Sequence, residues 1–568
     1  MNAEQRSPPL VLLALALLSA GALVVRLVGI GYLLPYHAEP DAVIVWQASY
    51  IERPAGAGMT DSSYPATYYP RLLARMLSVL PGHSYPQTLP ASASVEEHMA
   101  AAAEPYVRAR RLIAVLAALA VPAMFLVARR FLSPGWSLLA SAFMATSLLN
   151  TLYSQHARPH CASTSLSLIA MIPVLALVRS GRFWTYVAAG VLTGITIGCL
   201  QNGVFVVPAL VLAHVLSPRR NWKGFAAALA IVAIAFLRFY WFLFQEPIVN
   251  ANGDLDIGGQ TLNWSLVNGD GFRQMFLGFW SFEPVLCVAA ATGAAIGIAR
   301  LARRDRRPDA LTLREVCVAA AFPIAFALAW GWMSVVQPRF VNPLIPYLCI
   351  LGAFGASTVA RWIAERAPAL SQRAVGVATG FALLAVPAYA SIHLTVLRSR
   401  PSTIEIATRW LAEHAQRDRD LVLIETSFSI PVLEQTDGLA TEPAFFYSPW
   451  ERYQATLPAE ATREGYRLHR LFRPGMRSDM SRERIRAIVD EEHAQYAIVV
   501  VPTARAVRLN FTREGVRSAA GEPAFACWPY DPERTELHGS GYELGFHAFA
   551  RVWHSSLWGP PIEIYRLP

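Results

Sequence analysis

Apolar runs long enough to cross a membrane recur along this chain from Pro9 to His393. A helix needs roughly 20 apolar residues to cross the hydrocarbon core of a bilayer, and about eleven runs of this kind are present. Only 16% of the residues are charged, whereas soluble domains carry about a quarter. The sequence therefore predicts a polytopic α-helical membrane protein. The first run is Pro9–Gly29, and the others centre near Leu116, Phe143, Leu168, Gly190, Pro208, Ile231, Ala289, Ala325, Cys349 and Phe381.

The arginines in the short loops predict the sidedness of these spans, because basic residues resist translocation. Every second gap is rich in arginine, so we expect these gaps, and the N-terminus, to face the cytoplasm of a bacterial inner membrane. The net charge of +9 is then mainly a topology signal, and we expect no nucleic-acid partner. The basic gaps hold Arg129 and Arg130; Arg179 and Arg182; Arg219, Arg220 and Lys223; Arg300, Arg303, Arg304, Arg306 and Arg307; Arg361 and Arg366.

Sidedness and composition together predict two domains. Residues 1–397 form the transmembrane domain, with a large first extracytoplasmic loop over residues 31–107, and residues 398–568 form a small extracytoplasmic α/β domain. In this tail, helical patterns alternate with short apolar strands, as in α/β folds. Within the first loop, Tyr64–Leu80 has the spacing of an amphipathic helix. The predicted helix and strand pairs of the tail are Ser402–Gln416 with Leu421–Ile424, and Arg482–Glu492 with Tyr496–Val501.

The first candidate site is Tyr36-His-Ala-Glu-Pro-Asp-Ala42, directly after the first span. A carboxylate at the membrane surface can take a proton from a hydroxyl nucleophile, and burial near lipid raises the pKa of such a group. We select Asp41 as this base. The alternative is that Asp41 only caps the helix that runs to Tyr50, because aspartate is among the favoured N-cap residues.

Arginines provide the second kind of candidate. Arg108, Arg110 and Arg111 lie at the outer end of the second span, and Arg339 lies in the proline-rich entry to the tenth. A guanidinium group keeps its charge and matches phosphate oxygens with two parallel hydrogen bonds. The sequence is thus compatible with a phosphate site. Plain anchoring at the lipid headgroup level is the alternative for each arginine.

The third candidate is His156-Ala-Arg158-Pro-His160, at the outer end of the third span. Its side chains suit a phosphate, and the two histidines could also ligate a metal. Pro159 interrupts the helical spacing, and no acidic third ligand lies nearby in sequence, so we assign no metal site. Anchoring is again the alternative.

The order of these features resembles the GT-C class of polyprenyl-phosphate-dependent membrane glycosyltransferases and, within it, the protein-mannosyltransferase-like family (glycosyltransferase family 39). The tail resembles the outer domain of that family at Ala407-Thr-Arg-Trp410 and Gly559–Arg566. The other matching pieces are Arg26-Leu-Val-Gly29, Leu34-Pro-Tyr36 ahead of Pro40-Asp41, Ser63-Tyr64-Pro65 with Tyr68, Arg111-Leu-Ile113, Arg129-Arg130 and Arg339-Phe-Val-Asn-Pro-Leu-Ile-Pro346.

This resemblance implies transfer of a sugar from a polyprenyl-phosphate carrier to a lipid, glycan or protein acceptor on the outer face of the membrane. The first-loop motif of the family is usually Asp-Glu, and its Asp is the proposed base. Here the pair is Asp41-Ala42, with Glu39 two residues upstream as a second catalytic candidate. No cofactor is required, although a divalent metal is compatible with the class. The expected substrate-binding residues are Arg110, Arg111, His156, Arg158, His160, Arg339 and Tyr64.

Other functions are compatible with a chain of many spans. An envelope ligase or polymerase would move whole glycans between lipid carriers. A transporter should place charged residues in the middle of its spans, and few are found there. A binding or sensor protein that uses its spans only as an anchor for the tail would not need about eleven of them. A glycosyltransferase remains the prediction.

Overall fold

The structure is a computed structural model of the 568-residue chain. Asp41, Tyr64 and most of the helix predicted over Arg482–Glu492 lie outside the residues that it describes. The described residues are 8–39, 42–52, 71–241, 255–257, 260–262, 267–302, 309–367, 369–416, 421–424, 449–454, 457, 466–470, 483, 487, 490, 494–501, 507–534, 537 and 547–567.

The chain divides into two compact units, and each is discontinuous in sequence. The first unit comprises residues 1–27, 64–79 and 110–392, and the second comprises residues 28–63, 80–109 and 393–568. Most of the first extracytoplasmic loop therefore belongs to the same unit as the tail. The limits 1–397 and 398–568, which follow membrane sidedness, stay a prediction.

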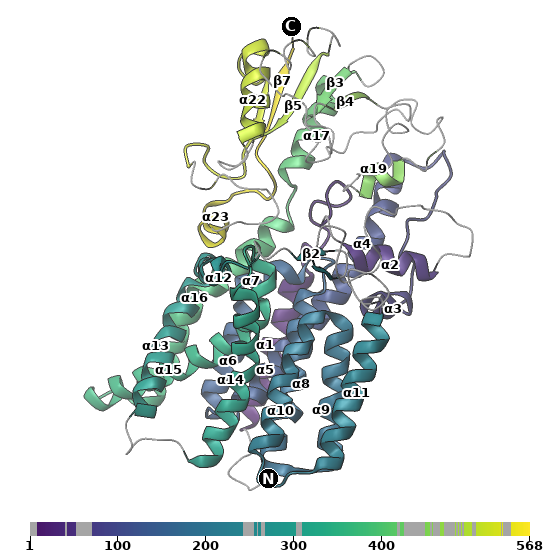
Figure 1. Ribbon diagram of the computed structural model, residues 1–568. Coiled ribbons are helices and arrows are strands. Elements are labelled where there is room, and N and C mark those ends of the chain that lie inside the picture. Colours follow the sequence, from purple (N-terminus) through teal and green to yellow (C-terminus); the bar gives the residue numbers. More distant parts are fainter. Residues whose placement is uncertain are drawn as a thin grey trace. The chain divides into compact units, whose positions relative to one another are not determined.

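Apolar helices make up the first unit (Figure 1). Among the described helices, eight are long and apolar enough to cross a membrane. The prediction of a polytopic α-helical protein with a small sheet domain is confirmed. The eight are α1 (Pro9–Leu27), α4 with α5 (Val95–Ala118 and Ala120–Ala128), α8 (His160–Ser180), α11 (Trp222–Tyr240), α13 (Pro284–Ala302), α14 (Ala310–Gly331), η6 with α15 (Pro338–Leu344 and Ile345–Arg366), and the run that begins with α16 (Gln372–Arg398).

Three predicted spans have a different form from the others. The runs around Gly190 and Pro208 form α9 (Phe183–Cys199) and α10 (Val206–Leu216), which are joined by the short helix η2 (Gln201–Phe205). The run around Phe143 is divided at Ser147 into α6 (Pro134–Thr146) and α7 (Leu148–Ser154). The Ser147 hydroxyl accepts a hydrogen bond from the backbone N–H of Asn150 at 3.1 Å and so caps α7. This break sets the path of the chain into α8.

The amphipathic helix expected over Tyr64–Leu80 is described only in its second part, as α3 (Leu72–Ser78). Leu73 and Leu77 are fully buried, whereas Arg71 and Arg75 are exposed. The separation of apolar and basic faces is therefore as predicted over this part. Helix α12 (Asp270–Phe282) is a further amphipathic helix of the same unit, and it leads directly into α13.

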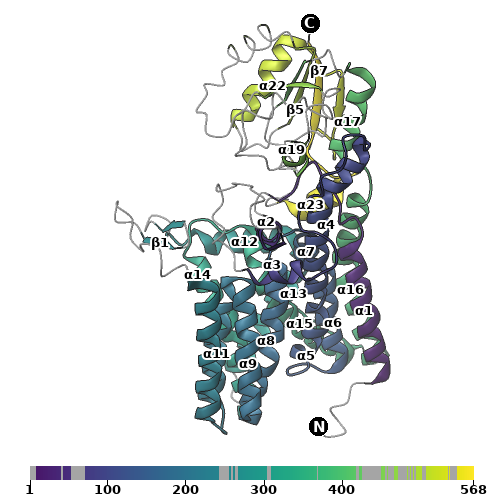
Figure 2. The same ribbon diagram turned by 90° about the vertical axis from the view of Figure 1, so that its right-hand side faces the viewer.

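The second unit contains a mixed five-stranded sheet in the order β4-β3-β5-β7-β6. Figure 2 shows two of its strands, β5 and β7, beside α22. The predicted strands are β3 (Leu421–Ile424) and β5 (Tyr496–Val500), and they pair in parallel. The predicted helix is α17 (Thr403–His414), which begins with a reciprocal capping box between Ser402 and Glu405. The remaining elements of the second unit are β4 (Arg467–Arg470), β6 (Phe525–Cys527), β7 (Ile562–Arg566), α2 (Val43–Glu52), α19 (Pro449–Gln454), α22 (Val507–Ala520) and α23 (Ala548–His554). The first unit also contains two short antiparallel strands, β1 (Leu255–Ile257) and β2 (Gln260–Leu262).

Candidate functional site

Three basic side chains from two distant segments of the sequence lie together in the first unit. The His160 ring, at the start of α8, stacks on Phe340 with ring centroids 5.3 Å apart. The guanidinium carbon of Arg339 lies 4.9 Å from the centroid of the same ring. Both Arg158 and Arg339 are within electrostatic reach of His160. We call Arg158, His160 and Arg339 the basic cluster; all three side chains are buried.

The backbone around the basic cluster explains how it forms. Pro159 directly precedes α8, where a missing N–H has no cost. Helix η6 has prolines at positions 338 and 343 and packs against α7, α8 and α12. The N-terminus of α8 adds partial positive charge to the two guanidinium groups. Together these groups make a buried electropositive site, which favours an anion such as a phosphate.

Arg110 and Arg111 are neighbours in α4, but they differ in burial. Arg110 is buried and Arg111 is exposed. The Ser165 hydroxyl of α8 donates to the Ala117 carbonyl at 3.3 Å, and α5, which continues α4, packs along α8, so the two run in parallel. Counting back at 1.5 Å per residue, Arg110 lies about 10 Å and His160 about 7 Å before this contact. Arg110 is thus at the level of the basic cluster.

His156 occupies a different environment from His160. It is fully buried, and its ring meets Tyr153 edge-on with the centroids 5.1 Å apart. Tyr153 in turn packs against Phe282 at the end of α12. Among the described residues, no group of three or more histidine, cysteine, aspartate or glutamate side chains is arranged to hold a metal ion.

A chain of buried polar side chains ties together the elements that carry the basic cluster. Arg26 of α1 is fully buried, and its Nη2 donates to the Asn150 side-chain oxygen at 2.8 Å. The Asn150 amide then donates to the Asn342 side-chain oxygen at 3.3 Å. These bonds connect α1, α7 and η6. They fix the segment before Arg158 against the helix that carries Arg339.

Glu283 supports α7 from the other side. This carboxylate lies between α12 and α13 and accepts hydrogen bonds from the Ser147 hydroxyl at 2.6 Å and the Leu149 N–H at 2.9 Å. Burial raises the pKa of Glu283 to about 7, and the donated hydrogen bonds oppose this rise. Sequence reasoning missed both Glu283 and Asn150. The available signal was a single polar residue within an otherwise apolar stretch.

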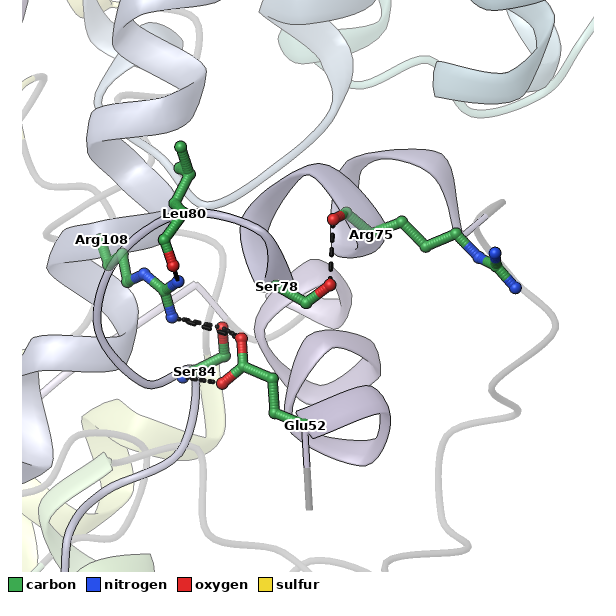
Figure 3. A network of polar contacts seen from close by, with 6 residues as sticks. All are labelled: Glu52, Arg75, Ser78, Leu80, Ser84 and Arg108. Carbon is green, nitrogen blue, oxygen red and sulfur yellow. Dashed lines mark hydrogen bonds and ion pairs between the residues drawn. The ribbon is translucent and has the colours of Figure 1, made fainter. Parts of the chain in front are cut away.

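Arg108 makes a structural contact in the second unit. Its guanidinium group donates to Glu52 Oε1 at 3.3 Å and to Ser84 Oγ at 3.0 Å, and also to the Leu80 carbonyl (Figure 3). The Ser84 hydroxyl donates to the same carboxylate at 2.8 Å. Arg108 therefore joins α4 to two parts of the first loop, the end of α2 and residues 80–84. We exclude it from the candidate phosphate site for this reason.

The expected carboxylates are not placed relative to the basic cluster. Glu39 is buried and belongs to the second unit, whereas the cluster lies in the first. Asp41 and Tyr64 lie outside the described residues. The roles of these three residues stay predictions from the sequence.

Comparison with known proteins gives similarity in structure only. No family model and no curated protein matches the chain. The archaeal oligosaccharyltransferase of Archaeoglobus fulgidus aligns at 11% identity and a TM-score of 0.46, over 92% of this chain and 73% of that one. ArnT of Cupriavidus metallidurans, solved with undecaprenyl phosphate, aligns at 15% identity and 0.39, over 79% and 76%. The Pmt1-Pmt2 protein O-mannosyltransferase of S. cerevisiae aligns at 16% and 0.31, over 49% and 37%.

These three solved structures belong to the GT-C class that the sequence resembles. Their TM-scores lie below 0.5 and their identities below 25%. Similarity at this level does not establish the activity of this chain.

Proposed function

We propose that this protein transfers a sugar from a polyprenyl-phosphate carrier to an acceptor hydroxyl on the outer face of the membrane. The observation that carries the proposal is the basic cluster, in which the His160 ring and the Arg339 guanidinium group both contact Phe340, and Arg158 is buried two residues before His160. The cluster lies at the ends of α8 and of the span that begins with η6. A lipid phosphate has its chain in the bilayer and its anionic head at such a boundary.

The chemistry of the donor suits guanidinium groups. In the reaction, the bond from the sugar anomeric carbon to the phosphate oxygen breaks, and the phosphate leaves as an anion. Arg158 and Arg339, with Arg110 at the same level, stabilise that charge without giving up a proton. Charge-assisted hydrogen bonds of this kind are worth roughly 1.5–3 kcal/mol each.

The acceptor side of the reaction requires a base. Asp41 takes the proton of the acceptor hydroxyl, whose oxygen attacks the anomeric carbon on the face opposite the phosphate. One bond forms and one breaks in a single displacement, so the anomeric configuration inverts. Glu39 is the second carboxylate of this loop, and we assign it a supporting role because the residue after Asp41 is alanine.

Asp41→Asn tests this proposal in membrane vesicles that hold the full-length protein and a radiolabelled polyprenyl-phosphate sugar. We expect transfer to fall by roughly 10²–10⁴-fold, the usual contribution of a general base. Expression and the binding of undecaprenyl phosphate should be unchanged, because the basic cluster is intact. Glu39→Gln is the matched variant of the neighbouring carboxylate, and a smaller loss is expected there.

The outcomes separate the candidate functions. Retained transfer in the Asp41→Asn variant would remove this residue from the mechanism. Transfer of oligosaccharide blocks but never of single sugars would identify a glycan ligase or polymerase. Movement of the lipid-linked sugar across a proteoliposome membrane without any covalent change would identify a transporter.

A further inference from the structure

A second candidate binding site lies in the first unit, in a groove between α1, α6, α15 and α16. Its volume is about 820 Å³. Most of its wall is apolar and includes Leu18, Leu139, Phe381 and Leu384. Arg361 and Arg373 lie at the end of the groove where α15 finishes and α16 begins. The groove therefore combines an apolar wall with cationic groups at one end.

Glycines on α16 leave room for the groove. A Cβ atom added to Gly376 would lie 3.5 Å from the Trp136 ring, and one added to Gly380 would lie 3.9 Å from Leu139. Both contacts are at ordinary van der Waals distance, so side chains larger than methyl would fill the space between α16 and α6. The missing side chains shape a slot beside the ring of Trp136.

The two arginines of the groove differ from the other arginines near this end. Among the residues that the structure describes, neither Arg361 nor Arg373 makes a hydrogen bond, an ion pair or a ring contact. By contrast, Arg366 stacks on Trp362 at 4.1 Å, and Arg179 forms an ion pair with the buried Glu315. Arg361 and Arg373 are exposed and available to a ligand.

We infer that this groove binds a glycerophospholipid with an anionic headgroup. The headgroup phosphate lies between Arg361 and Arg373, and one acyl chain follows the apolar wall along α16. The groove is formed by membrane-spanning helices, so its apolar part faces hydrocarbon and its charged end faces the lipid headgroups. A soluble anion would leave the apolar wall unused, and a zwitterionic lipid would bring a third cation to an end of the groove that already holds two.

This lipid site is separate from the proposed donor site. Arg339 and Arg361 lie at opposite ends of the continuous span Pro338–Arg366. At 1.5 Å per residue they are about 33 Å apart, which is the thickness of a bilayer core. Failure of the sugar-transfer proposal would therefore leave the lipid proposal untouched.

Native mass spectrometry of the full-length protein, titrated with phosphatidylglycerol or with phosphatidylcholine of the same acyl chains, tests the inference. We expect tighter binding of phosphatidylglycerol by roughly tenfold or more, since each arginine near a headgroup contributes about 1 kcal/mol. Arg361→Ala with Arg373→Ala should remove this preference. Gly380→Leu should reduce the retention of both lipids, because its side chain fills the slot while both charges remain.

Arg366→Ala is the matched control, because it removes a cation from the same helix end without touching the groove. We expect its lipid preference to equal that of the unchanged protein. Equal binding of the two lipids by the unchanged protein, or a preference that survives in the double variant, would overturn the inference. Displacement of phosphatidylglycerol by equimolar undecaprenyl phosphate would also overturn it, since the groove would then belong to the carrier. If the double variant does not elute as a folded particle, two separate single variants, Arg373→Gln and Gly380→Leu, test the inference. The first should weaken the preference for phosphatidylglycerol, and the second should reduce the retention of both lipids.

Discussion

The span formed by η6 and α15 carries one arginine on an aromatic ring at each end, and the two differ in burial. Arg339 lies over Phe340 at 4.9 Å and is 9% exposed. Arg366 lies over Trp362 at 4.1 Å and is exposed to its surroundings. The ring contact is common to both, so it does not decide which arginine has a function.

Burial and charged neighbours make the difference between these two ends. A cation–π contact is worth about 0.5–1 kcal/mol when exposed and about 2 or more when desolvated. Arg339 is also within electrostatic reach of His160, together with Arg158. An arginine fixed in such a buried positive site favours an anionic ligand, whereas Arg366 is typical of a basic residue at a membrane surface.

The largest expected effect separates the two ends by substitution. Arg339→Ala should lower sugar transfer by about a hundredfold, because a charge-assisted contact to the leaving phosphate is lost. Arg366→Ala should leave transfer unchanged. Arg339→Lys should recover only part of the loss, because an ammonium group cannot make the paired hydrogen bonds. Rates of label transfer measure all three, and equal rates for Arg339→Ala and Arg366→Ala would erase the contrast.

A second prediction concerns the carboxylate that supports the buried end. The pKa of Glu283 is raised by burial from 4.5 to about 7, so the folded state holds a proton that the unfolded state releases. Stability should therefore fall as the pH rises from about 4.5 to about 7, by an amount on the order of 3 kcal/mol. Glu283→Gln should remove this fall. Thermal unfolding in detergent at pH 5 and pH 8 measures it.

The control for this pH experiment is Glu365→Gln, which changes an exposed carboxylate of α15, next to Arg366. Its pH dependence should match that of the unchanged protein. A Glu283→Gln protein that loses stability across the same pH window as the unchanged protein would show that this carboxylate is not the group responsible.

A third prediction tests the chain of buried polar side chains, Arg26, Asn150 and Asn342, near the Arg339 end of the span. Asn150→Ala removes an acceptor from the fully buried Arg26 and a donor to Asn342. We expect a loss of about 2 kcal/mol, because a buried donor without its partner pays its full desolvation cost. Thr292→Ala, on an exposed face of α13, should change the stability by less than about 0.5 kcal/mol. Similar melting temperatures for the two variants would argue against the polar chain as a support.

The smallest expected effect contrasts a buried with an exposed ion pair. The Arg108 and Glu52 side chains are 6% and 12% exposed, whereas Arg273 and Asp270 are 68% and 35% exposed. Arg108→Ala should cost about 1–2 kcal/mol, because Glu52 is left with fewer partners. Arg273→Ala should cost close to zero, as is usual for surface pairs. A larger loss from Arg273→Ala would reverse this order.

Much of the fold follows from local pattern in the sequence. The length of the apolar runs identifies the spans, and the apolar runs at 421 and 496 identify β3 and β5, two of the three inner strands. The polar strand β4 and the short strand β6 lie at the sheet edges, where no apolar run is required. The break at Ser147 was not predicted, because it depends on Glu283, which is 136 residues away.

The candidate site is predictable only in part for the same reason. Position at the end of a span marks Arg158 and Arg339 as candidates. His160 and Arg339 meet on the Phe340 ring because η6 packs against α8, which no local pattern reports. The sequence treats Arg110 and Arg111 alike, but neighbouring residues of a helix point about 100° apart. Only Arg110 is on the buried side.

The most direct test of the account is to locate the lipid phosphate on the protein. A polyprenyl phosphate with a photoactivatable group beside its phosphate would be crosslinked to the full-length protein and mapped by mass spectrometry. The account predicts labelled peptides that contain Arg158 to His160 and Arg339, and loss of this label in the Arg339→Ala variant. Label confined to peptides with Arg361 and Arg373, or label that persists at the first position without Arg339, would contradict it.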